Sequence, residues 1–168
     1  MKNIIIGAIV GAVVGAGVSG VIVSANANKP AAKPAAAAQT AAKAQEKQKV
    51  VYHINYAGGE QGRLYRAALT NIQNHIDAVG APNLDLKVVM HGLGLDILKD
   101  AKEDDDLKKR IGSLKNQHVA FQVCDIALTR RKIDYTKDMF DVSKDDIVPS
   151  GVAELARLQN MGYAYIKP

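Results

Sequence analysis

The spacing of apolar residues changes repeatedly along residues 49–168, and each spacing predicts a strand or a helix. The first run, KVVYHINY at 49–56, is β-branched and aromatic, which is typical of a buried strand. From Glu60 to Val79 apolar residues recur every three or four positions, which predicts a helix that stops at Gly80. Further strands are predicted at residues 84–90, 118–123, 147–148 and 163–166, and further helices at residues 96–101, 104–114, 125–133 and 150–160.

This alternation predicts an α/β domain with a five-stranded, mainly parallel sheet and helices on both faces. Binding and catalytic sites in such sheets form at the carboxyl ends of the strands. The residues at those predicted ends are Asn55, Tyr56, His91 with Gly92 and Gly94, Cys124, and Ser150. They are the candidates for chemistry or ligand binding.

Residues 4–23 form an uncharged apolar run that would span about 30 Å as a helix, the thickness of a bilayer core. The run is followed by Ala25-Asn26-Ala27, an A-x-A pattern of the kind that a signal peptidase cuts. A cleaved signal peptide and an uncleaved membrane anchor both fit residues 1–27. In either case we expect the domain to be periplasmic or otherwise exported, and an anchor would tether it to the inner membrane through residues 4–23.

Residues 28–48 are rich in Ala, Pro and Lys and contain no large apolar side chain, so they cannot build a core. The chain is therefore divided into a signal peptide or anchor at 1–27, a linker at 28–48 and a domain at 49–168.

The net charge of +5 belongs mostly to the leading segments and says little about the domain's partner. Residues 1–48 hold five basic and one acidic side chain, whereas residues 49–168 hold 17 basic and 16 acidic ones. Nucleic-acid binding sites combine basic charge with stacking aromatics, and the chain has no Trp. We expect no nucleic-acid partner. The His, Asp and Glu residues lack metal-ligand spacing, so we expect no metal and no other cofactor.

Cys124 is the only cysteine, and it lies where a strand passes into a helix. The positive end of a helix dipole favours the thiolate, which is the nucleophilic form, whereas the neighbouring Asp125 opposes it. Arg130 and Arg131 lie about two helical turns further on, so we do not assume that they pair with the thiol. The alternative is a buried cysteine that packs as a small hydrophobe.

His91 could serve as a base for Cys124 if the strands that end at these residues are neighbours. Gly92 and Gly94 could expose backbone N–H groups to an anion, or could simply form a tight turn. Ser150 is explained best as a helix cap. His53, within the first strand, is expected to be structural or to lie at a subunit interface.

Three segments together resemble the DsrE/DsrF-like family, specifically its exported single-domain members. They are VVMHGLGLDIL at 88–98, VAFQVCDIALTR at 119–130 and IVPSGVAELARLQNMGYAYIKP at 147–168. The resemblance implies a three-layer α/β/α sandwich and a homo-oligomer, commonly a trimer or hexamer. It also implies that sulfur is carried as a persulfide on a cysteine at the position of Cys124. In exported relatives Gly-Asn-Thr often follows that cysteine, whereas here Asp125-Ile126-Ala127 does.

The leading hypothesis is a persulfide carrier or sulfurtransferase-like protein in which Cys124 accepts sulfur and a donor or acceptor protein is the partner. The first alternative is a non-catalytic oligomeric module that binds a small ligand or a protein at the same strand ends. The second is a membrane-tethered accessory protein.

Overall fold

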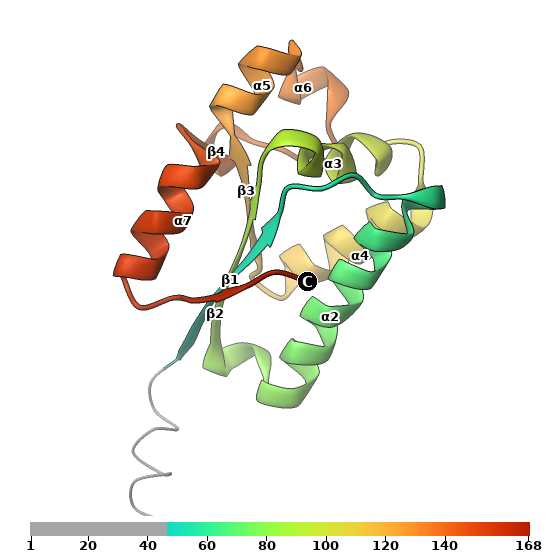
Figure 1. The fold of residues 1–168 in the computed structure, drawn as a ribbon. Helices are drawn as coiled ribbons and strands as arrows, with labels where there is room; N and C mark the ends of the chain where they lie inside the picture. Colours follow the sequence, from blue (N-terminus) through green and yellow to red (C-terminus); the bar gives the residue numbers. More distant parts are fainter. Residues whose placement is uncertain (1–46) are drawn as a thin grey trace, which may run out of the picture. The chain divides into compact units, whose positions relative to one another are not determined.

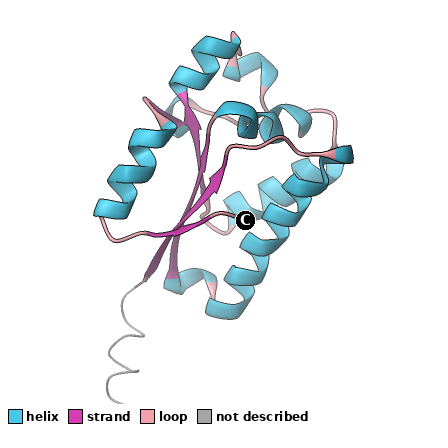
Figure 2. Cartoon of the chain, in the orientation of Figure 1, coloured by secondary structure: helices cyan, strands magenta, loops and turns pink. Residues whose placement is uncertain are grey.

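A five-stranded parallel sheet is the centre of the fold in the computed structural model, which describes residues 47–168 (Figures 1 and 2). The strands are β1 (Gln48–Ile54), β2 (Leu84–Met90), β3 (Ala120–Cys124), β4 (Ile147–Val148) and β5 (Ala164–Ile166). Their order across the sheet is β4-β3-β2-β1-β5, and all four pairings are parallel. The predicted α/β fold is confirmed, and the sheet is entirely rather than mainly parallel.

Helices cover both faces of the sheet. Helix α7 (Gly151–Asn160) packs against one face, and α2 (Arg63–Val79) and α4 (Asp105–Asn116) lie on the other (Figure 1). Three short helices lie near the carboxyl ends of the strands: α3 (Asp96–Asp100), α5 (Asp125–Arg131) and α6 (Tyr135–Asp138). Four 3-10 turns complete the helical segments: η1 (Glu60–Gly62), η2 (Ala81–Asn83), η3 (Gly92–Leu95) and η4 (Lys144–Asp146).

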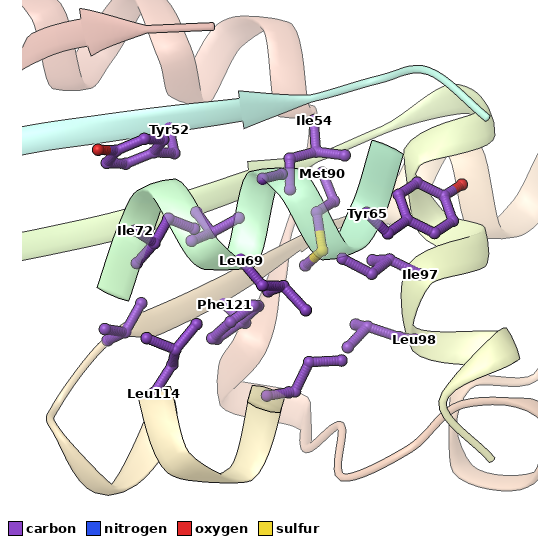
Figure 3. Close-up of a cluster of buried hydrophobic side chains, with 14 of the residues drawn as sticks. Tyr52, Ile54, Tyr65, Leu69, Ile72, Met90, Ile97, Leu98, Leu114 and Phe121 are labelled. Atoms are coloured by element: carbon purple, nitrogen blue, oxygen red, sulfur yellow. The ribbon is translucent and has the colours of Figure 1, made fainter. Parts of the chain in front are cut away.

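Apolar side chains form the larger core between the sheet and α2 and α4. Figure 3 shows Leu69 and Ile72 of α2, Leu114 of α4 and Phe121 of β3 gathered there. Complete burial of such a side chain contributes roughly 1.5–3 kcal/mol. This explains why the helical spacing predicts a helix against the sheet, although the helix begins at Arg63 rather than at Glu60, which lies in the η1 turn.

A smaller cluster holds α7 on the opposite face. Val51 of β1 and Val89 of β2 lie under Leu155 and Leu158 of α7, and Tyr163 closes the cluster. The two valines mark the sheet face that α7 covers.

A buried carboxylate fixes α7 to β3. Glu154 of α7 is 7% exposed, and its Oε1 accepts a hydrogen bond of 2.9 Å from Nε2 of Gln122. Arg157 donates to both carboxylate oxygens, at 2.8 and 2.7 Å. These hydrogen bonds, those from Arg157 first, lower the pKa of Glu154 although burial acts against them.

Several element ends differ from the sequence predictions. Asn55 and Tyr56 lie beyond the end of β1 rather than within the strand. Helix α5 ends at Arg131 rather than residue 133, because Lys132 adopts a left-handed φ of 54°. Helix α6 was not predicted; it spans four residues and is capped by the Asp134 side chain, which accepts from the Thr136 amide.

The segment predicted as a signal peptide or anchor, and all but the end of the predicted linker, lie outside the described residues. Within residues 47–168 no helix is both long and apolar enough to span a bilayer.

Candidate functional site

Cys124 and His91 meet at the carboxyl edge of the sheet. Cys124 ends β3 directly before α5 begins, and His91 follows β2, the strand beside β3. Gly151 at the start of α7 lies between them: a β-carbon built on it would be 3.0 Å from Cβ of His91 and 3.2 Å from Cβ of Cys124. Only a glycine lets the helix approach both residues so closely without displacing one of them.

A cavity of about 370 Å³ opens over this meeting point. Its walls are His91, Gly92, Cys124, Ile126, Ala127, Arg130, Arg131, Ser150 and Val152. Cys124 is 5% exposed, whereas Ile126 and Val152 are among the most exposed large apolar side chains of the described residues. The cavity therefore has a buried thiol at its wall and an apolar, solvent-facing rim.

The two arginines of α5 share the cavity with Cys124, which the sequence did not predict. The Arg131 guanidinium turns toward the η3 turn, where it donates to the Gly92 carbonyl oxygen at 2.8 Å and to Asp96 at 2.6 Å. Arg131 lies about two helical turns after Cys124 along α5. Because α5 is short and the arginine side chain is long, both residues still border the same cavity. The sequence signal for this arrangement would have been the two basic residues in the last turn of a short helix that starts next to a cysteine.

His91 is hydrogen-bonded to a second histidine rather than to the thiol. Its Nε2 lies 2.8 Å from Nε2 of His53, and Nδ1 of His53 lies 2.7 Å from the Tyr165 hydroxyl. The two imidazole rings have centroids 4.7 Å apart. Between the described residues His91 and Cys124 the structure has no hydrogen bond, so the role of His91 as the base of Cys124 stays a prediction.

The surroundings disfavour the protonated form of both histidines. Burial, followed by the charges of Lys167 and His91, lowers the pKa of His53 to about 4. Burial, followed by Lys167, also lowers the pKa of His91. The sequence suggested a structural or interface role for His53. Its contact with His91 could not be predicted, because the two residues are 38 positions apart.

Asn55 lies next to this pair but does not line the cysteine cavity. Its side-chain oxygen accepts a hydrogen bond from Nζ of Lys167, which also lies 5.1 Å from the centroid of the Tyr56 ring. Burial lowers the pKa of Lys167. Asn55 therefore holds the lysine whose charge acts on both histidines.

Gly92 and Gly94 form a tight turn. Gly92 has a left-handed φ of +55°, and the Gly94 N–H donates to the His91 carbonyl oxygen at 3.0 Å. A β-carbon on Gly94 would lie 2.0 Å from the Ile54 carbonyl oxygen. Close backbone packing accounts for Gly94, whose N–H is already occupied.

Tyr65 and Ser150 support the two segments that bracket the site. The buried Tyr65 hydroxyl lies 2.8 Å from the carbonyl oxygen of Leu93 and holds the η3 turn. Ser150 caps α7, its hydroxyl accepting from the Ala153 amide at 3.4 Å. The capping interpretation of Ser150 agrees with this contact, and its side chain also borders the cavity.

These features define an α/β protein with an all-parallel sheet and a lone thiol at the carboxyl end of an interior strand. The chain belongs to the DsrE/DsrF-like family, whose match covers residues 18–168.

Two solved structures share the fold. One is MTH1491 from Methanobacterium thermoautotrophicum, a protein of unknown function. It is 26% identical, with a TM-score of 0.60, and the similarity covers 73% of this chain and 100% of that one. The other is the YchN protein from E. coli, 19% identical with a TM-score of 0.53, covering 72% of this chain and 99% of that one. Among curated proteins, none matches the chain.

Proposed function

We propose that this protein carries sulfane sulfur on Cys124 as a persulfide. The observation that carries the proposal is the position of the thiol: Cys124 lies directly before the first residue of α5 and lines a cavity that also contains His91 and two arginines. Membership of the DsrE/DsrF-like family is consistent with a role in sulfur relay.

The transfer step uses the thiolate of Cys124 as the nucleophile. It attacks the outer sulfur of a donor persulfide, R–S–SH, and the donor's S–S bond breaks. The products are Cys124–S–SH and the donor thiolate, R–S⁻, which then takes a proton. Arg130 lines the cavity and would favour the anionic forms on both sides of this step, whereas the Arg131 guanidinium is already paired with Asp96.

Location and assembly are part of the same proposal. The apolar run at residues 4–23 and the A-x-A pattern after it support an exported protein, released or tethered to the membrane. The exposed Leu93, Ile126 and Val152 offer apolar surface near the cavity for a second copy or for a donor or acceptor protein. We propose a homo-oligomer, a trimer or a hexamer, as the working form.

Intact-mass analysis of the full chain tests the carrier function. After exposure to glutathione persulfide we expect the protein to gain about 32 Da, one sulfur atom, and to lose it again on reduction. Cys124→Ser should gain nothing under the same conditions. If the wild-type mass stays unchanged while a control peptide thiol is converted to its persulfide, the proposal is wrong.

The 5% exposure of Cys124 favours one alternative, a non-catalytic module that binds a ligand over the same strand ends. In that case Cys124→Ser retains the cellular phenotype of the wild type, whereas substitution of Gly92 in the η3 turn abolishes it. The carrier function predicts loss of the phenotype in Cys124→Ser.

A further inference from the structure

Four polar side chains form a row across the sheet, one for each of four adjacent strands. Cys124 ends β3, His91 follows β2, His53 belongs to β1 and Tyr165 to β5, in the order in which these strands lie side by side. Strand register places them on one face, because Tyr165 pairs with Val51, which packs under α7. His53 and His91 are each two residues along from Val51 and Val89, so alternation brings them to that face as well.

Three members of the row, His91, His53 and Tyr165, are joined by hydrogen bonds. Both ring nitrogens of His53 are occupied, Nε2 by His91 and Nδ1 by the Tyr165 hydroxyl. His53, in the middle of the row, is 8% exposed, whereas Tyr165 at its end is 42% exposed. At its other end, His91 lines the cavity that contains Cys124.

Neutral imidazoles allow this row two arrangements of protons. A neutral imidazole carries one N–H, so the two Nε2 atoms share a single proton. In one arrangement Tyr165 donates to His53, and His53 donates to His91. In the other every donor and acceptor is exchanged: His91 donates to His53, and His53 donates to the tyrosine oxygen. The two arrangements differ only in proton positions, and no heavy atom has to move far.

Burial, followed by the charge of Lys167, favours the neutral form of both histidines in the row. Asn55 holds Lys167, and Arg131, which borders the cavity, is paired with Asp96. A proton that reaches His91 therefore sits in unfavourable surroundings, and a path to solvent relieves this.

We propose that His53 and Tyr165 form a proton relay between His91, in the cysteine cavity, and solvent. When the Cys124 thiol gives up its proton to His91, His91 passes its Nε2 proton to His53. His53 passes its Nδ1 proton to the tyrosine oxygen, and the tyrosine releases its own hydroxyl proton to water. One proton enters the row and one leaves it, so no oxidant or reductant is required. His53 and Tyr165 are positioning residues, because they act through His91. The relay rests on the proposed thiol chemistry but not on the identity of the sulfur donor.

Alkylation of Cys124 in the full chain by iodoacetamide, followed across pH, tests the relay without any sulfur donor. In His53→Gln the glutamine amide can hydrogen-bond but cannot accept and pass on a proton. We expect the alkylation rate near pH 7 to fall about tenfold. Tyr165→Phe, at an exposed position, should lower the rate as well.

Tyr52→Phe is the matched control, because it removes another tyrosine hydroxyl that lies 3.0 Å from a histidine Nδ1, that of His75, outside the row. Its alkylation rate should stay within about twofold of the wild type. Nitrogen-15 NMR of the wild type at pH 7 should show one protonated and one bare Nε2 for the pair His53 and His91.

The relay is wrong if both His53→Gln and Tyr165→Phe alkylate as the wild type does, or if both Nε2 atoms carry protons at pH 7. These outcomes differ from failure of the carrier function. In that case the persulfide adds no mass to Cys124, but the two relay variants still slow its alkylation.

Discussion

Two glycines shape the site by the side chains that they lack. Gly94 lets the η3 turn lie against the end of β1, and Gly151 lets α7 begin between His91 and Cys124. The sequence offered a tight turn as one interpretation of Gly94 but gave no reason to single out Gly151. Its role depends on a contact between segments that are distant along the chain.

Gly94→Ala should be strongly destabilising, because the β-carbon of the alanine would overlap the Ile54 carbonyl oxygen. A backbone atom cannot move out of the way by changing rotamer, as a side chain can. We expect a loss of about 2–3 kcal/mol in the free energy of unfolding, measured by urea denaturation. Gly112→Ala is the matched control: a β-carbon there meets nothing within 4 Å, and Gly112 lies inside α4. It should raise stability by up to about 1 kcal/mol. Equal urea midpoints for the two variants would contradict this account.

Other residue-level contacts could be found only in three dimensions. The sequence placed Cys124 and His91 correctly at strand ends, since strand boundaries follow from apolar spacing. The partners of His53, by contrast, come from 38 and 112 positions away. Side-chain partners at such distances depend on strand order and register, and periodicity carries no information about either.

At the scale of elements, α7 is the one that both covers a sheet face and borders the cysteine cavity. Its position depends on the small cluster around Leu155 and Leu158 and on the buried carboxylate of Glu154. Periodicity predicted this helix to within one residue of its bounds, Gly151–Asn160. It could not predict α6, because a single turn has too few residues to show helical spacing.

Glu154→Gln should weaken the attachment of α7, because the neutral amide cannot replace a carboxylate bound by Arg157. We expect a loss of about 1–3 kcal/mol in unfolding free energy at pH 7. Since the folded-state pKa of Glu154 is lowered, the carboxylate's contribution is present above about pH 4.5 and is lost as the pH falls through the folded-state value. The difference between variant and wild type should therefore shrink in acid.

Asp105→Asn is the control for that measurement. Asp105 pairs with Lys108 at 3.1 Å but its side chain is 95% exposed, so the change should stay within about 0.5 kcal/mol. If Asp105→Asn lowered the free energy of unfolding as much as Glu154→Gln does, burial would not explain the stabilising effect of the Glu154 contacts.

At the scale of the whole molecule, the alternation of strands and helices was enough to predict the α/β class. The order β4-β3-β2-β1-β5 was not predicted. The sequence of strands and helices along the chain does not determine which strands become neighbours of β1 in the sheet. That order decides which strand ends are neighbours and hence which residues form the site.

The stability of the molecule should depend on pH through the buried His53. The pKa of His53 falls to about 4 on folding, so between about pH 6.5 and 4 the unfolded chain binds a proton that the folded protein does not. The unfolding free energy should stay level from pH 8 to 7 and drop by about 1–2 kcal/mol from pH 7 to 5. Urea denaturation at each pH measures this, and His53→Gln should make the drop shallower. A wild-type protein equally stable at pH 7 and pH 5 would contradict the burial of neutral histidines.

The pairing of β5 with β1 also affects how the protein is made. β1 lies inside the finished sheet, yet Val50, Val51 and Tyr52 pair with residues that follow them by more than 110 positions. During translation that edge of β1 has no partner until the ribosome has synthesised β5. An apolar strand with a free edge is a template for aggregation. The nascent chain therefore carries an edge that can pair with other chains until its last residues have been made.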